Sequence, residues 1–215
     1  MTILLADPRV AAVPVHESYE QLVTLGSSFG PARARVRAGL AARLRAAQMA
    51  LPVGVSLRVI EGHRPAATQS EIIAFHSDQV TAAYPDAPAD EKRRLASRFA
   101  APLGVAPHVA GAAVDLTLVD SRGLELDLGT PIYATPEGNQ SCFDALDIPA
   151  EARARRDLVA RVLTEVGLVN YPTGWWHWSY GDRYWALLTG AEAAIYGPIV
   201  DLDWPDEVLW HEHVA

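Results

Sequence analysis

Three residues have the types and spacing of a catalytic metal site. His108 and Asp115 lie seven positions apart, and His177 follows two tryptophans further along the chain. Two imidazoles and a carboxylate are a usual ligand set of catalytic zinc, which keeps its fourth position open for water. A zinc hydrolase also needs a base, whose natural position is three residues before the last ligand. The chain has Gly174 there, so the pattern predicts a site that holds metal and lacks the ordinary hydrolytic base.

The sequence around Asp115 limits how these ligands can meet. In an unbroken strand, residues seven apart lie on opposite faces, so the chain must bend between His108 and Asp115. Pro107 and Gly111 are placed for this bend, and His177 would come from a neighbouring hairpin. A histidine among tryptophans is more often a hydrogen-bonded core residue than a ligand. A buried aspartate on an apolar strand is harder to explain that way, because an unpaired charge is costly there.

The elements that position these residues follow no regular rhythm. Apolar spacing and flanking prolines predict helices over 31–49, 67–83 and 89–100, and one from Pro149 to a C-cap at Gly167. Alternation predicts strands over 55–59 and 113–119, and a hairpin that joins 168–171 to 175–179. The arginines of the first helix are expected on a solvated surface: Arg33, Arg35, Arg37, Arg43 and Arg45. Strands separated by helices without a βαβ rhythm predict an α+β fold.

Composition narrows the classes of function and partner. The 215 residues are half hydrophobic, which predicts a folded domain, and the net charge of -8 without a basic stripe argues against nucleic acid. No stretch approaches the ~20 apolar residues of a membrane span, and the first residues do not resemble a signal peptide. The single cysteine, Cys142, fits a reducing cytoplasm and is expected to be a small buried hydrophobe.

Several segments together resemble the zinc-dependent D-alanyl-D-alanine dipeptidases. Residues 107–118 (PHVAGAAVDLTL) are similar to the family's SxHxxGxAxDLTL, and 170–185 (NYPTGWWHWSYGDRYW) resemble its EWWH segment. Residues 61–65 (EGHRP) resemble (D/E)GYRP, and 7–10 and 128–131 also match. The resemblance covers residues 3–198 and implies a single α+β domain over 1–198. A central, mainly antiparallel sheet flanked by helices would carry the zinc site, as in the related hedgehog fold.

The resemblance implies a role for each matching residue. His108, Asp115 and His177 match the ligands of one zinc ion per chain. Arg64 matches the arginine that polarises the scissile carbonyl and stabilises the oxyanion, a role suited to a fixed guanidinium. A structural pair with a carboxylate is the alternative for Arg64.

The departures from the family pattern gather in the site. Gly174 replaces the glutamate base, and His63 replaces the tyrosine of GYRP. Ala106 replaces a serine, and Tyr133 replaces an aspartate that lies where the family holds the substrate amine. Together with Trp175, Ala106 and Tyr133 are the expected substrate-binding positions.

The missing glutamate changes the expected chemistry. Gly174 offers no proton to a leaving amine, a contribution typically worth about 10²–10⁴-fold. Glycine would also leave room for a larger substrate, and a pocket without the serine and glutamate favours a less polar one. His63 is a candidate for the replacement acid or base, and Glu61 is a weaker one.

Three functions therefore stay open. The chain is a zinc enzyme for another small dipeptide-like, amide or carboxylate substrate, a residual or disabled dipeptidase, or a non-catalytic zinc protein that binds a ligand. The acidic segment 199–215 is a predicted C-terminal tail. Its Trp204 and Trp210 would dock on the same domain or form a homodimer, and its His211-Glu212-His213 is more typical of a surface than of a metal site.

Overall fold

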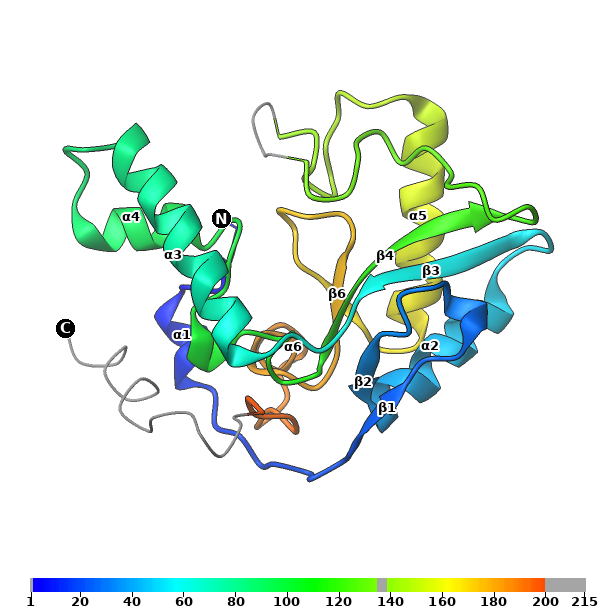
Figure 1. Cartoon of the computed structure of the whole chain (residues 1–215), viewed down its shortest axis with the longest axis horizontal. Helices are drawn as coiled ribbons and strands as arrows, with labels where there is room; N and C mark the ends of the chain where they lie inside the picture. Colours follow the sequence, from blue (N-terminus) through cyan, green and yellow to red (C-terminus); the bar gives the residue numbers. More distant parts are fainter. Residues whose placement is uncertain (1, 135–138, 200–215) are drawn as a thin grey trace. The chain divides into compact units, whose positions relative to one another are not determined.

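The computed structural model describes residues 2–134 and 139–199 (Figure 1). Contacts along the chain group these residues into two compact units. The first unit contains residues 2–18, 64–111 and 181–199, and the second contains residues 19–63 and 112–180. Apart from Ile199, the predicted tail, with its two tryptophans and the His211–His213 segment, lies outside the described residues.

A four-stranded sheet forms the centre of the second unit. Its strand order is β3-β4-β6-β5, and each neighbouring pair is antiparallel. The strands are β3 (Val55–Glu61), β4 (Ala113–Asp120), β5 (Val169–Asn170) and β6 (His177–Ser179). The predicted α+β fold with a mainly antiparallel sheet is confirmed, as are both strands and the hairpin.

Two helices of the same unit, α2 (Ala38–Ala50) and α5 (Ala150–Glu165), pack into one core with the sheet (Figure 1). Alternate residues of β4 enter this core, namely Val114, Leu116 and Leu118, each 0% exposed. Full burial of such a side chain contributes about 1.5–3 kcal/mol. Because side chains alternate along a strand, the core fixes Asp115 on the opposite face of β4.

The prediction of a helix over 31–49 is wrong for its first residues. The helix begins at Ala38, and the residues before it form β2 (Arg35–Arg37), which pairs antiparallel with β1 (Leu22–Thr24). A short 3-10 turn, η1 (Ser27–Phe29), connects these two strands in the sequence. Val36 is 0% exposed and is the register partner of Val23, so the pairing with β1 decides the local structure here.

One of the arginines expected on the surface is instead buried. Arg37 is 6% exposed, and its guanidinium donates a hydrogen bond to the carbonyl oxygen of Glu20 at 2.6 Å. Arg37 ends β2 and directly precedes α2, so its side chain ties this junction to the backbone at Glu20.

The first unit is helical. It contains α1 (Pro8–Ala12), α3 (Ala66–Ala83), α4 (Ala89–Ala96), the 3-10 turn η2 (Leu103–Val105) and α6 (Arg183–Thr189). Asp7 and Asp182 cap α1 and α6 through side-chain hydrogen bonds to backbone N–H groups. The predicted helices 67–83 and 89–100 are confirmed, the second in shortened form. Among the described residues, no helix has the length and apolar character needed to cross a membrane.

The turn after β3 depends on the absence of a side chain at Gly62. A Cβ atom there would lie 2.5 Å from the carbonyl oxygen of Arg35 and 3.0 Å from Cγ1 of Val36. The N–H of His63 donates to the same Arg35 oxygen at 2.6 Å. Strand β2 therefore fixes the position of the turn that carries His63 and Arg64.

We predict that Gly62→Ala lowers the free energy of unfolding by about 1–3 kcal/mol, because the new methyl group must push β2 away. Urea unfolding measures the change. Gly26→Ala is the matched control, since a Cβ there would make an ordinary contact of 3.7 Å with Oγ of Ser28. Equal stability losses in the two variants would contradict this account of Gly62.

Candidate metal centre

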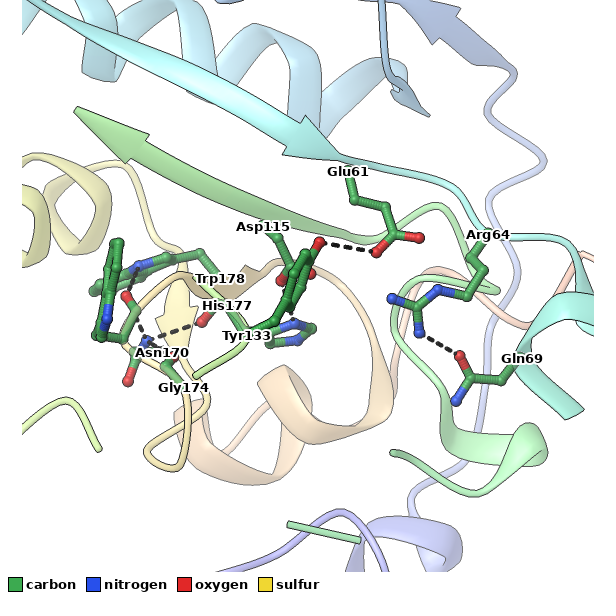
Figure 2. A network of polar contacts seen from close by, with 10 residues as sticks. Glu61, Arg64, Gln69, Asp115, Tyr133, Asn170, Gly174, His177 and Trp178 are labelled. Carbon is green, nitrogen blue, oxygen red and sulfur yellow. Dashed lines mark hydrogen bonds and ion pairs between the residues drawn. The ribbon is translucent and has the colours of Figure 1, made fainter. Parts of the chain in front are cut away.

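Two of the predicted ligands face each other across a strand pair. Asp115 on β4 is the direct partner of His177 on β6 in the antiparallel register. Directly opposed residues point to the same face of a sheet. Nδ1 of His177 lies 3.0 Å from Oδ1 of Asp115, and the two residues are 8% and 2% exposed (Figure 2). The sheet register therefore builds this pair.

The third ligand lies in the turn before β4. Residues 107–111 form the predicted bend, and Gly111 adopts a φ of 64°, which glycine tolerates best. The carbonyl oxygen of His108 accepts hydrogen bonds from the N–H groups of Gly111 at 3.0 Å and Arg64 at 3.1 Å. The His108 backbone is therefore fixed where the chain reverses, and the imidazole is buried at 4% exposure.

The three side chains form one cluster. One ligand atom from each of His108, Asp115 and His177 lies within 4.8 Å of the other two. Ligand atoms at the usual zinc bond lengths of about 2.0–2.2 Å are separated by roughly 3.4 Å in a tetrahedron. The observed spacing needs only a small contraction. A buried set of two imidazoles and a carboxylate therefore fits a divalent metal ion.

The hairpin that carries His177 is braced by one side chain, Asn170. Its Nδ2 donates to the carbonyl oxygens of His177 at 2.9 Å and Gly174 at 3.1 Å (Figure 2). The N–H of Tyr171 donates to the carbonyl oxygen of His177 at 3.0 Å, and the N–H of His177 donates to Gly174 at 3.1 Å. Sequence reasoning missed Asn170, although an asparagine before a Pro-containing turn is a recognisable signal.

Gly174 does not leave open space, so that expectation is wrong. A Cβ at this position would lie 3.0 Å from Cε2, 3.2 Å from Cζ2 and 3.3 Å from Nε1 of Trp176. The indole thus covers the place from which a residue 174 side chain would start. The backbone of Gly174 is buried, and the Trp176 side chain is half-buried. Glycine here accommodates an aromatic ring.

The predicted catalytic arginine is oriented by a buried amide. Nη1 of Arg64 donates to Oε1 of Gln69 at 2.7 Å (Figure 2). Nε2 of Gln69 in turn donates to the carbonyl oxygen of Ala101 at 2.8 Å. Gln69 is 1% exposed, so its orientation is fixed. The sequence gives no signal for this role, because a lone glutamine on a helix is ordinarily a surface residue. His63, beside Arg64, is half-buried.

The three predicted substrate-binding residues differ in environment. Trp175 is 2% exposed and belongs to the hydrophobic core, with its Nε1 donating to Oγ1 of Thr130 at 2.9 Å. Ala106 is also buried, at 2% exposure. Tyr133 is 53% exposed and has a φ of 62°, a strained conformation for a bulky residue. Of the three, Tyr133 has the most accessible side chain.

Glu61 lies in the same row of the sheet as Asp115 and His177. At the end of β3 it is the register partner of Asp115, beyond an irregularity between Val59 and Glu61. Glu61, Asp115 and His177 therefore form one row across three strands. The hydroxyl of Tyr133 donates to Oε2 of Glu61 at 3.3 Å, and Figure 2 shows this contact beside Asp115.

We predict that Asn170→Ala weakens metal binding by about tenfold, the lower limit usual for residues that orient ligands. The variant frees the carbonyl oxygens of Gly174 and His177 from their shared donor. Competition with a chromophoric chelator measures the affinity, and urea unfolding of the metal-free protein serves as the control. Unchanged affinity would show that the backbone pairing alone positions His177.

Comparisons with known proteins agree with this geometry. The family model described as D-ala-D-ala dipeptidase matches residues 26–190. A D-alanyl-D-alanine dipeptidase of Synechocystis sp. is 35% identical over 96 residues, which cover 40% of this chain and 38% of that protein. The D-alanyl-D-alanine dipeptidase of Escherichia coli is 33% identical over 70 residues, which cover 33% of this chain and 35% of that protein. The matched stretches thus span little more than a third of each relative. The chain belongs to the D-ala-D-ala dipeptidase family of metallopeptidases.

Proposed function

We propose that the chain is a zinc-dependent enzyme that acts on a small dipeptide-like, amide or carboxylate substrate, with chemistry altered from that of its dipeptidase relatives. The buried cluster of His108, Asp115 and His177 carries this proposal. A carboxylate on an apolar strand is expensive to bury, and a bound cation offsets that expense. The curated relatives named as dipeptidases support a peptide-like substrate.

The protein's own residues have separate tasks in this proposal. His108, Asp115 and His177 would hold the metal, which when bound polarises a carbonyl group and lowers the pKa of water. Arg64 would stabilise negative charge that develops on the substrate oxygen, since Gln69 already restrains its guanidinium. Preorganised donors of this kind need little rearrangement during the reaction.

Proton transfer is the step in which the chain differs from its family pattern. Gly174 has no side chain, and the indole of Trp176 packs on its backbone. His63 and Glu61 are the proposed replacement groups. Glu61 has the stronger structural support, because it is the strand partner of Asp115 and its carboxylate accepts a hydrogen bond from Tyr133. A weakly active dipeptidase is the second candidate function. The packing of Trp176 on Gly174 favours it, because the ring fills the space that a larger substrate would need.

We predict one zinc ion per chain in the purified protein. Changing His108, Asp115 or His177 to alanine should lower the occupancy, because each removes one ligand from a set of three. Elemental analysis after dialysis measures it, and His16→Ala is the control. Full zinc occupancy in the double variant Asp115→Ala/His177→Ala would refute the assignment.

We also predict slow cleavage of D-alanyl-D-alanine by the wild-type chain. Gly174→Glu should raise this activity by at least about tenfold if the carboxylate alone is missing, since acid-base groups contribute about 10²–10⁴-fold. Gly174→Ala is the matched control, because it displaces the Trp176 ring without adding a carboxylate. Product release is followed by chromatography of free D-alanine.

The two variants separate the candidate functions. A rise with Gly174→Glu and none with Gly174→Ala identifies a dipeptidase that lost its base. No rise with either, together with turnover of another dipeptide or amide by the wild type, supports altered chemistry. Wild-type turnover of D-alanyl-D-alanine equal to that of an ordinary relative would contradict both.

A further inference from the structure

Two aromatic rings meet at an edge of the second unit, beside the row of residues that carries the metal ligands. The rings of Tyr133 and Trp176 are T-shaped, with centroids 5.9 Å apart and an interplanar angle of 75°. This is a favourable aromatic geometry. We call Tyr133 and Trp176 the aromatic corner. Neither ring is fully buried, since Tyr133 is 53% exposed and Trp176 is half-buried.

Chain connectivity and sheet register place the aromatic corner next to the cluster. Trp176 directly precedes His177, and the hydroxyl of Tyr133 is 3.3 Å from Oε2 of Glu61. Glu61 is the strand partner of Asp115, and Asp115 is the strand partner of His177. Neighbouring strands are about 4.8 Å apart. Trp176 is therefore adjacent to one predicted ligand, and Tyr133 contacts a residue that lies one strand away from another.

The Trp176 ring is held on two sides. On one side it covers Gly174, where a Cβ would approach its Cε2 atom to 3.0 Å. On the other side it makes a T-shaped contact with Trp175, with centroids 5.5 Å apart. Because Trp175 is a core residue at 2% exposure, the rigid core supports the indole. Glycine at 174 and tryptophan at 176 therefore act as one packing unit.

The loop that carries Tyr133 is clamped at both ends by Arg156. This residue is 0% exposed and donates to the carbonyl oxygens of Leu128 at 2.7 Å, Gln140 at 2.9 Å and Cys142 at 2.6 Å. Burial lowers the pKa of Arg156 to about 10, so the guanidinium stays protonated at neutral pH. A buried cation therefore holds the backbone on both sides of the segment that contains Tyr133.

The same loop is joined to the hairpin of the metal ligand. The N–H of Trp175 donates to the carbonyl oxygen of Ser141 at 3.0 Å, and the N–H of Phe143 donates to that of Pro172 at 3.0 Å. An exposed tyrosine with left-handed backbone is strained, and such strain persists only where surrounding contacts impose it. The hydroxyl contact with Glu61 and the ring contact with Trp176 hold the Tyr133 side chain, which stays partly in solvent.

We infer that the aromatic corner is a specificity subsite for a ring-bearing side chain of the substrate, so the substrate class is dipeptide-like molecules with an aromatic or comparable planar group. This rests on the proposed function and deepens it. Small-molecule sites are lined mainly by apolar and aromatic groups with a few fixed polar ones. The corner supplies two rings, and Glu61 supplies the polar group that orients Tyr133.

The test compares D-alanyl-D-alanine with D-phenylalanyl-D-alanine and D-alanyl-D-phenylalanine on the zinc-loaded full chain. Equilibrium dialysis measures binding, and release of free amino acids measures kcat/KM. We expect at least one ring-bearing peptide to be preferred by roughly tenfold, the effect of burying a phenyl ring against two aromatic groups. Trp176→Ala and Tyr133→Ala should each reduce the preference ratio at least threefold, and Tyr133→Phe should retain most of it.

The matched control is Tyr19→Ala. Tyr19 belongs to the same unit, is 84% exposed and also has left-handed backbone, with a φ of 58°. Its removal should leave the preference ratio unchanged. Circular dichroism and zinc content confirm that each variant is folded and loaded.

The outcomes separate this inference from the proposed function. Ring preference in binding without cleavage of any peptide supports the subsite and contradicts the hydrolytic function. Cleavage without ring preference, or a ratio that Trp176→Ala and Tyr133→Ala leave unchanged, overturns the subsite and keeps the enzyme. If no peptide binds or is cleaved, both are wrong.

Discussion

The burial of Asp115 is the constraint on which the rest of the site depends. Its neighbours on β4, Val114 and Leu116, are 0% exposed and lock the strand against α2 and α5. The carboxylate is thereby forced onto the other face, where it is itself 2% exposed. A charge in that position needs a compensating partner. His177 opposite it and His108 in the preceding turn provide the setting for a cation.

Backbone carbonyl groups are the points at which the site is held. Asn170 bonds two of them within the ligand hairpin, and Arg156 bonds three in the loop beside it. Gln69 uses another such group, at Ala101, to fix the guanidinium of Arg64. Buried polar groups that are fully bonded specify one arrangement, because breaking any bond leaves an unsatisfied group. The predicted ligands are thus held by buried side chains, few of which are themselves expected to take part in the chemistry.

Four residues around the cluster are linked by successive contacts. Glycine at 174 admits the indole of Trp176, and that indole meets the ring of Tyr133. The tyrosine hydroxyl in turn bonds Glu61, which pairs with Asp115 across the sheet. A change at one of these positions alters what the next can pack against.

The fold class, most of the helices and strands, and the three residues of the buried cluster were predictable from the sequence. The α+β arrangement follows from alternating residues in β3 and from apolar spacing in α5, since these periods indicate which face is buried. The bend at Gly111 was likewise predictable, because residues seven apart on one strand cannot converge.

The short strands and the polar contacts to the backbone depend on three-dimensional packing. Strands β1 and β2 have three residues each, too few for a period, so their pairing depends on contacts distant in sequence. Gln69, Asn170 and Arg156 act through backbone groups that no side-chain pattern reveals. The filling of the Gly174 position by Trp176 depends on where one ring turns, and that direction is set by three-dimensional packing. The sequence identifies which reactive side chains are present, and three-dimensional packing decides which of them lie in contact.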